Sequence, residues 1–227
     1  MTLPFIIDKE SLNFSNVSYL IDKHGICVIE DFFSQDFVER LFQESKRILH
    51  LHKDLIDILD KEDCSKDERI FNAQDLSPTI LDFSEIPFFK DIALKFGKSL
   101  RLNTLLNRLV YEEGLTKNSG AGWHRDNHHC QFKVIVYLTD VTIFNGNFQW
   151  ITNSSHKFIG YPEPRSEDYN TRFSDEVIHD IIINNPTCEL IDIIGKKGTV
   201  ILADTTYIHR GNIIKEGERY ALTQYFF

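Results

Sequence analysis

The run FKVIVYLTDVTIFNGNFQWIT, residues 132–152, contains two short stretches rich in β-branched and aromatic residues, with Asp and Asn-Gly turn signals between them. Similar runs follow one another in this half of the chain: LLNRLVY, CELIDII, GTVILAD and RYALTQYFF, separated by Gly, Asn, Asp and Ser. Several short strands at such spacing indicate a sandwich or barrel rather than a parallel sheet with alternating helices. The chain from Thr104 onward is therefore predicted to form a mainly β core.

The residues before Thr104 have a different pattern. HGICVIEDFFSQDFVERLFQESKRIL predicts a strand over Ile26–Ile29 and then a helix that Ser34 caps at its N-terminus. IPFFKDIALKFGKSL predicts a second amphipathic helix, which ends near Gly97. Residues 51–77 are charged and uneven in pattern, and a short helix and a loop are expected there.

No linker divides the chain, so residues 1–227 are predicted to form a single domain. Its N-terminal helical support is expected over about 1–103 and its β core over about 104–227. The connection at 160–187 is much longer than the others and holds three prolines and many charges. Long connections on a β scaffold are commonly lids or binding loops, so this one is predicted to be a lid-like insertion.

Composition excludes several classes of function. The net charge of −9 argues against nucleic acid, because phosphate binding requires a basic surface. No apolar run is long enough to span a membrane, and the N-terminus MTLPFIIDKE does not resemble a secretory signal. The four cysteines are scattered without a CxxC spacing, as expected of reduced thiols in a cytoplasmic protein. The sequence does not indicate an oligomeric state.

The segment GWHRDNHH, residues 122–129, contains three histidines and one aspartate. A His-x-Asp pair, here His124 and Asp126, is a weak signal by itself, because a polar exposed loop has the same composition. It becomes informative when a third ligand comes from another strand. Two histidines and one carboxylate can occupy one face of an octahedral metal, which is the ligand set of non-haem Fe(II) oxygenases.

The candidate third ligand is His209, in GTVILADTTYIHRGN, at the end of a buried-looking strand and before a Gly-Asn turn. A lone histidine in that position can equally be structural. The final strand ERYALTQYFF then carries Arg219 among apolar residues, where a guanidinium must find an anion or reach outward to solvent. Facing inward, it would clamp a carboxylate through two hydrogen bonds; facing outward, it would pair with Glu216 or Glu218.

In this order and context, the motifs resemble those of the Fe(II)/2-oxoglutarate dioxygenases, and most closely the phytanoyl-CoA dioxygenase (PhyH)-like family. The resemblance covers roughly residues 25–227. Besides the ligands, it includes RLVYEEG ahead of the metal motif, Trp123 directly before His124, and the stretches VIVYLTDVTIFNGNF, NSSHK and GTVILADTTYIHRG.

The resemblance implies a double-stranded β-helix, a cupin-like jelly roll, with the N-terminal helices packed on one outer sheet face. It implies that His124, Asp126 and His209 hold Fe(II), and that 2-oxoglutarate and O2 are cosubstrates. It places the distal carboxylate of 2-oxoglutarate on Arg219. Two further positions of the cosubstrate pocket fall on Arg108 and Tyr137. For these two, the alternatives are a substrate contact or surface ion pair for Arg108 and a core aromatic for Tyr137.

Two positions depart from the pattern of the family. The pair at 112–113 is Glu-Glu where Lys-Pro is usual, and the pair at 153–154 is Asn-Ser where a Pro-Gly turn is usual. Neither change falls on the metal motif. His128 and His129 are not needed by the triad, and they either line the mouth of the iron site or lie on an exposed turn.

The implied activity is hydroxylation of an unactivated C–H bond in a small-molecule metabolite, with release of succinate and CO2. Desaturation, cyclisation and epimerisation at the same site remain open alternatives. A non-catalytic jelly-roll binding domain is disfavoured, because the three ligands and the arginine are present together. Halogenases of this superfamily replace the carboxylate ligand with a small residue, so Asp126 favours hydroxylation. The sequence does not identify the substrate.

Overall fold

The computed structural model describes residues 3–58, 66–97, 103–114, 122–126, 131–155 and 172–227. The helices are α1 Phe14–His24, α2 Gln35–Leu51, α3 Pro78–Ser84, α4 Pro87–Lys95 and α5 Asp175–Asn184, with 3-10 turns at Lys53–Leu55 and Ala73–Asp75. The strands are β1 Ile6–Ile7, β2 Ile26–Ile29, β3 Asp57–Ile58, β4 Lys66–Ile70, β5 Thr104–Val110, β6 Trp123–His124, β7 Phe132–Tyr137, β8 Phe148–Ile151, β9 Arg172–Phe173, β10 Leu190–Ile193, β11 Val200–Asp204, β12 His209–Gly211 and β13 Glu218–Phe226.

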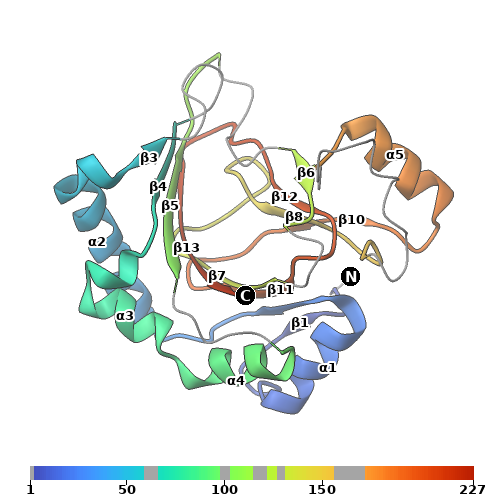
Figure 1. Ribbon diagram of the computed structural model, residues 1–227, viewed down its shortest axis with the longest axis horizontal. Helices are drawn as coiled ribbons and strands as arrows, with labels where there is room; N and C mark the ends of the chain where they lie inside the picture. The colour runs from blue at the N-terminus through green and yellow to red at the C-terminus, as the bar shows by residue number, and fades with distance from the viewer. Residues whose placement is uncertain (1–2, 59–65, 98–102, 115–121, 127–130, 156–171) are drawn as a thin grey trace.

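The strands form two sheets that face each other as a jelly roll, which confirms the predicted double-stranded β-helix. The larger sheet has the order β1-β2-β11-β7-β13-β5-β4-β3, and the smaller one β10-β8-β12-β6-β9. Among the described strands, every pairing is antiparallel except that of β1 with β2. Helices α1 to α4 cover the outer face of the larger sheet, and α5 lies beside the smaller sheet (Figure 1). The predicted position of the N-terminal helices is thus confirmed.

Strand β7 shows why both faces of the larger sheet are buried. Its side chains alternate, as side chains of any strand do. Val134 and Val136 join the core beneath the helices, whereas Ile135 and Tyr137 join the core between the two sheets. The strand is therefore apolar almost throughout, and its one charged residue, Lys133, has to be accommodated inside the roll.

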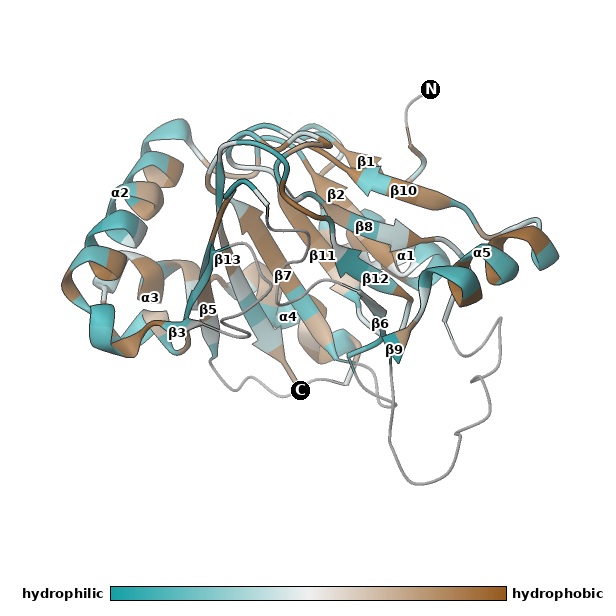
Figure 2. Ribbon diagram, turned by 90° about the horizontal axis from the view of Figure 1, so that it is seen from above, coloured by the Kyte–Doolittle hydropathy of each residue, from teal (hydrophilic) through white to brown (hydrophobic). Residues whose placement is uncertain are grey.

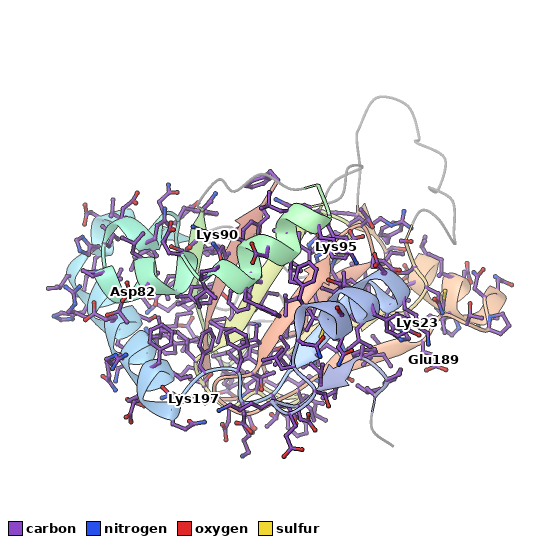
Figure 3. All side chains as sticks on the ribbon, turned by 90° about the horizontal axis from the view of Figure 1, so that it is seen from below. Lys23, Asp82, Lys90, Lys95, Glu189 and Lys197 are labelled. Carbon is purple, nitrogen blue, oxygen red and sulfur yellow. The ribbon has the colours of Figure 1, made fainter. Side chains whose placement is uncertain are left out.

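The helices that cover the sheet are amphipathic, as the sequence predicts for α2 and α4. Hydrophilic residues, in teal, and hydrophobic residues, in brown, both occur on α2, α3 and α5 (Figure 2). Charged side chains such as Lys23, Asp82 and Lys95 lie at the outer surface of the layer (Figure 3). The side chain of Ser34 accepts a hydrogen bond from the amide of Phe37, which confirms the predicted N-cap of α2.

The expectation of a short helix and a loop over residues 51–77 is wrong in one respect. Lys66–Ile70 forms strand β4, which pairs with β5 along its whole length. The sequence KDERI does not have the apolar pattern of a strand, because its polar residues form ion pairs on both faces of the sheet. Asp67 and Arg69 pair with each other inside the roll, while Glu68 pairs with Arg108 on the outer face. The N-terminal part of the chain thus contributes strands as well as helices.

The predicted lid-like insertion at 160–187 falls partly outside the described residues. Its described part, from residue 172, forms strand β9 and helix α5. Of the four cysteines, Cys27 and Cys188 are buried free thiols, and Cys64 and Cys130 fall in the part that is not described. No helix in the described ranges combines the length and the apolar character that crossing a membrane requires.

Gly25 ends helix α1 in the left-handed conformation, with φ of 74°, and offers a test of the packing. A Cβ added there would lie 2.3 Å from a ring carbon of Tyr207. We expect Gly25→Ala to lower the free energy of unfolding by about 1–2 kcal/mol for the left-handed backbone and by about 1–3 kcal/mol more for the overlap. Urea unfolding followed by tryptophan fluorescence measures the loss.

Gly217 is the matched control, because its φ is 64° but nothing lies within 4 Å of an added Cβ. Gly217→Ala should therefore show the backbone cost alone. Equal losses in the two variants would mean that Tyr207 does not pack against Gly25 as described.

Candidate metal centre

Two short strands of the smaller sheet bring the predicted histidines together. In the pairing of β12 with β6, His209 lies directly opposite His124, and the centroids of their rings are 4.5 Å apart. On the neighbouring strand β8, the rings of Phe148 and Trp150 lie 5.3 and 6.2 Å from that of His209. Apolar rings thus hold one side of the pair, and His209 is fully buried at 2% exposure.

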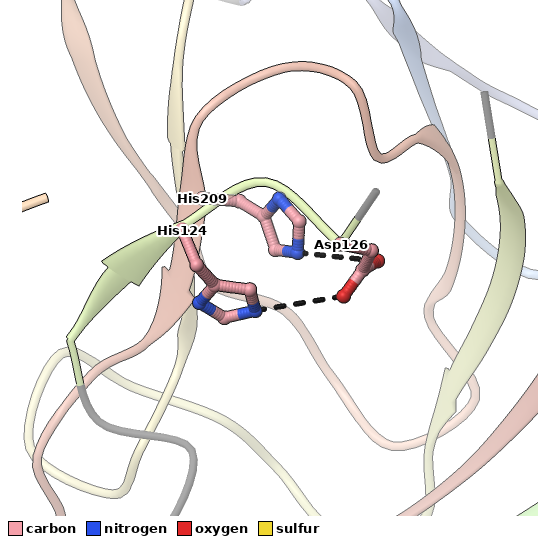
Figure 4. Close-up of side chains that lie close together, drawn as sticks. All are labelled: His124, Asp126 and His209. Atoms are coloured by element: carbon pink, nitrogen blue, oxygen red, sulfur yellow. Dashed lines mark ion pairs between the residues drawn. The ribbon is translucent and has the colours of Figure 1, made fainter. Parts of the chain in front are cut away.

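Asp126 completes the triad two residues beyond His124. Its amide donates to the carbonyl of Thr205, which turns the chain at the end of β6. Each of its carboxylate oxygens lies 3.6 Å from an Nε2 atom, one from that of His124 and one from that of His209 (Figure 4). All three ligand atoms lie within 4.8 Å of one another. A single metal ion placed among them could bind one atom from each residue.

The hydrogen bonds of the imidazoles fix their orientation toward this point. Nδ1 of His124 is 2.9 Å from the carbonyl of Gly122, and Nδ1 of His209 is 2.8 Å from that of Tyr207. Because a carbonyl oxygen only accepts, each Nδ1 carries a hydrogen, and Nε2 of the neutral ring then presents a lone pair. This arrangement, in which the outer nitrogen is held by the backbone, is typical of metal-binding histidines.

The charge states also suit a cation. Burial lowers the pKa of His209 to about 4, so its imidazole is neutral at neutral pH. Burial would raise the pKa of Asp126, but the ammonium of Lys133, together with the two imidazoles, holds it well below its usual range. Nε2 of His209 has no hydrogen-bond partner among the described residues. Two imidazoles, a carboxylate and a buried unsatisfied nitrogen fit a divalent metal.

The triad opens into a cavity of about 400 Å³ between the two sheets. Its wall on the larger sheet comes from the inward-facing residues of four strands. Those with polar side chains are Asp67 and Arg69 of β4, Asn107 of β5, Lys133 and Tyr137 of β7, and Arg219, Thr223 and Tyr225 of β13. Arg125 and Arg172 of β9 also line the cavity. The cavity therefore contains carboxylate, ammonium and guanidinium groups beside apolar side chains such as Leu105, Ile135 and Phe148.

Arg219 is brought to this cavity as predicted, and its guanidinium lies inside the roll. One terminal nitrogen donates to the carbonyl of Gly146, and the other donates to Oδ1 of Asn107 at 2.6 Å. Its Nε has no partner, and no carboxylate pairs with it in the described part of the chain. The outward alternative does not hold, because Glu218 pairs instead with Arg108. A buried guanidinium without a counterion is a natural anion site.

Tyr137 also lines the cavity, next to Arg219, and it is almost completely buried. Its hydroxyl donates to the carbonyl of Ile193 and accepts from the amide of Phe148. Burial raises the pKa of this phenol to about 12. The hydroxyl is thus a neutral group that joins β7 to the smaller sheet.

Arg108 is the predicted residue that the structure does not bring to the cavity. Side chains alternate along β5, so Asn107 and Leu109 face inward and Arg108 faces outward. Its guanidinium pairs with Glu68 at 3.0 Å and with Glu218 at 2.9 Å, over the ring of Tyr220. It is therefore a surface ion pair, the alternative stated for it above.

The polar residues of the cavity that are absent from the predicted site include Asp67, Arg69, Asn107 and Lys133. Asp67 accepts two hydrogen bonds from Arg69 and one from Nδ2 of Asn107, whose Oδ1 faces Arg219. The ammonium of Lys133 lies 2.6 Å from Oδ2 of Asp126. Burial opposes the charge of Lys133, yet Asp126 raises its pKa overall. For Lys133 a signal existed, because a single lysine interrupts the apolar strand.

The positions that depart from the family pattern lie away from the triad where they are described. Residues 112–113 are exposed, beyond the end of β5. Asn153 adopts a left-handed φ of 50°, and the buried hydroxyl of Ser154 accepts from the amide of Ile208 next to His209. This turn thus supports the strand that carries a ligand. His128 and His129 lie outside the described residues.

Comparison with solved structures finds the same fold in other proteins. The chain is similar to the non-heme alpha ketoglutarate dependent epimerase SnoN from nogalamycin biosynthesis, with 14% identity and a TM-score of 0.72 over 94% of this chain and 82% of that chain. EctD from S. alaskensis has 20% identity and a TM-score of 0.67 over 92% and 75%. HygX from Streptomyces hygroscopicus, solved with nickel and 2-oxoglutarate, has 18% identity and a TM-score of 0.62 over 92% and 84%.

The search of curated proteins found no match. The family model described as phytanoyl-CoA dioxygenase (PhyH), in contrast, matches residues 21–213, which is most of the chain and includes all three residues of the triad. The chain therefore belongs to the phytanoyl-CoA dioxygenase (PhyH) family.

Proposed function

We propose that the protein is an Fe(II)- and 2-oxoglutarate-dependent oxygenase that hydroxylates a C–H bond of a small molecule. The observation that carries this proposal is the content of one cavity. Two imidazole nitrogens and a carboxylate converge at one end, and on the wall lies a buried guanidinium that has no counterion among the described residues. Membership of a dioxygenase family supports the same conclusion.

His124, Asp126 and His209 would hold the iron. Two imidazoles and one carboxylate on one face of an octahedral ion leave three positions open, as a chelating 2-oxo acid and O2 require. Iron, 2-oxoglutarate and O2 together supply the oxidation of the C–H bond, with succinate and CO2 as coproducts. The protein fixes both rings through the carbonyls of Gly122 and Tyr207, so that the ligand atoms are positioned before the metal arrives.

Arg219 would bind the distal carboxylate of 2-oxoglutarate. Asn107 and the carbonyl of Gly146 hold two of its nitrogens and so aim the guanidinium into the cavity. The fixed fork would place the keto-acid end of the cosubstrate toward the triad. The apolar residues Ile135, Phe148 and Leu105 complete the wall and keep bulk water from the reacting atoms.

Hydroxylation is the proposed outcome among those open to such a site. Asp126 is present, so the position that halogenases leave for a halide is filled by a carboxylate. The similar structures include an epimerase and a carbocyclase, as SnoN and SnoK are described, and these outcomes remain the alternatives for this chain. Mass spectrometry of the product separates them, because hydroxylation adds one oxygen atom and epimerisation adds none.

The test of the proposed function is succinate formation. We expect the purified protein to release succinate from 2-oxoglutarate when Fe(II) and O2 are present, slowly without a substrate and faster with one. Chelation of the metal or exclusion of O2 should stop the release. If succinate does not form above the level of a boiled control under any condition, including a metabolite screen, the proposal is wrong.

A further inference from the structure

Lys133 is a buried ammonium group at the metal end of the cavity, and the proposed function does not account for it. Only 9% of the residue is exposed. Its Nζ lies 2.6 Å from the carboxylate of Asp126 and 5.1 Å from the centroid of the Tyr225 ring. Among the described residues, Asp126 is its counterion. A metal that binds Asp126 therefore shares the one negative charge that stabilises this lysine.

The charges in the cavity do not balance once metal and cosubstrate are bound. Asp67 and Arg69 neutralise each other through two hydrogen bonds. Lys133 and Asp126 cancel in the same way. A divalent metal adds two positive charges, which the two carboxylates of 2-oxoglutarate cancel, and Arg219 adds one more. These groups together then carry one net positive charge, and the other charged side chains of the described lining, Arg125 and Arg172, are also cations. Uncompensated buried charge is strongly unfavourable.

The register of β13 and β7 shows which of the two cationic side chains, Arg219 or Lys133, lies away from the cosubstrate. In the pairing of β13 with β7, Ala221 lies opposite Tyr137 and Tyr225 lies opposite Lys133. Arg219 is therefore near the Tyr137 end of β7, whereas Lys133 is four residues away, about 13 Å along the strand. Because Asp126 lies beside Lys133, the cosubstrate must extend from the metal toward Arg219 and away from the lysine. Lys133 faces the part of the cavity that remains for the substrate.

We propose that the primary substrate carries a negatively charged group, a carboxylate, and that Lys133 binds it beside the metal. The inference rests on the proposed function, since the charge count includes the metal and 2-oxoglutarate. It assigns Lys133 a role in selecting the substrate. Binding the anion there would also hold the far end of the molecule at a fixed distance from the iron.

The experiment compares acids with their neutral counterparts. Wild-type protein is first loaded anaerobically with Fe(II) and 2-oxoglutarate, and the charge-transfer band of the complex is recorded. Hexanoate, benzoate, hexanamide and benzamide are then titrated as probes, with the perturbation of the band and the melting temperature as readouts. We expect each acid to bind at least about 10-fold more tightly than its amide, as a charge-assisted hydrogen bond would provide.

Three variants identify the group responsible. Lys133→Met keeps the length of the side chain without its charge, and it should remove the preference for acids while changing the affinity for 2-oxoglutarate less than about 3-fold. Lys133→Arg keeps the charge and should retain the preference. Lys23→Met, which removes a charge from the exposed surface of α1, should behave as wild type.

The outcomes separate this inference from the proposed function. If no charge-transfer band forms in the wild type before any probe is added, both fail at that step. If the band forms but neither acid binds, or acids and amides bind equally, the substrate assignment is overturned and the oxygenase proposal stands. The same holds if Lys133→Met loses affinity for 2-oxoglutarate instead, because Lys133 would then belong to the cosubstrate site.

Discussion

His124→Ala is expected to remove succinate formation completely while the protein stays folded. The variant deletes one of two imidazole ligands, leaving one nitrogen and one carboxylate for the metal. Removal of a residue that hydrogen-bonds to a metal ligand already lowers metal affinity about 10- to 100-fold. Removal of the ligand itself should lower the affinity further. Anaerobic equilibrium dialysis with Fe(II) measures the affinity, and turnover is measured separately.

Folding should survive this change because His124 is only partly buried and makes one hydrogen bond, to Gly122. Such a bond contributes about 1 kcal/mol to stability. The control is His50→Ala, which removes an exposed histidine from the outer helix α2 and should keep full metal affinity. A His124→Ala protein that binds Fe(II) as tightly as wild type would show that the three residues are not the metal site.

The strands of the C-terminal half could be predicted because each has a local signature. Runs such as VIVY and VILA are apolar on both faces and end at turn residues, so the pattern identifies them without their neighbours. Strand β4 has no such signature, because its charges are neutralised by partners distant in the sequence. Asn107, for example, donates to Asp67 from forty residues away. Helix α1 is not among the predicted elements either, although Asn13 and Gly25 cap it at both ends.

The residues of the candidate site could likewise be predicted where each has a local signal in the sequence, but not where its role depends on distant partners. His124 and Asp126 are adjacent in a motif, and Arg219 is a lone charge in an apolar strand, so each has a signal of its own. Arg108 also interrupts an apolar strand, but the sequence does not indicate which face of β5 it occupies. One residue of register decides between the cavity and the surface. Lys133 has the same signal as Arg219, and only the structure shows that it contacts a candidate metal ligand.

The final prediction concerns Arg219, whose replacement by lysine should weaken binding of 2-oxoglutarate about 10- to 100-fold. A lysine keeps the positive charge but loses the planar fork that can meet both oxygens of a carboxylate. Each lost hydrogen bond to a charged group costs about 1.5–3 kcal/mol, and about 1.4 kcal/mol corresponds to one factor of ten in Kd. The anaerobic charge-transfer titration of the Fe(II) protein gives the affinity directly.

Arg108→Lys is the matched control, because the two arginines lie on neighbouring strands and face opposite sides of the sheet. It removes the same fork from an ion pair with Glu68 and Glu218, and it should leave the Kd for 2-oxoglutarate unchanged. Fe(II) affinity should stay within about 3-fold of wild type in both variants, since neither residue touches the triad. Equal losses in the two variants would mean a general effect of charge or stability. An unchanged Kd in Arg219→Lys would show that this guanidinium does not hold the cosubstrate, because a lysine cannot form the two parallel hydrogen bonds that the proposed contact requires.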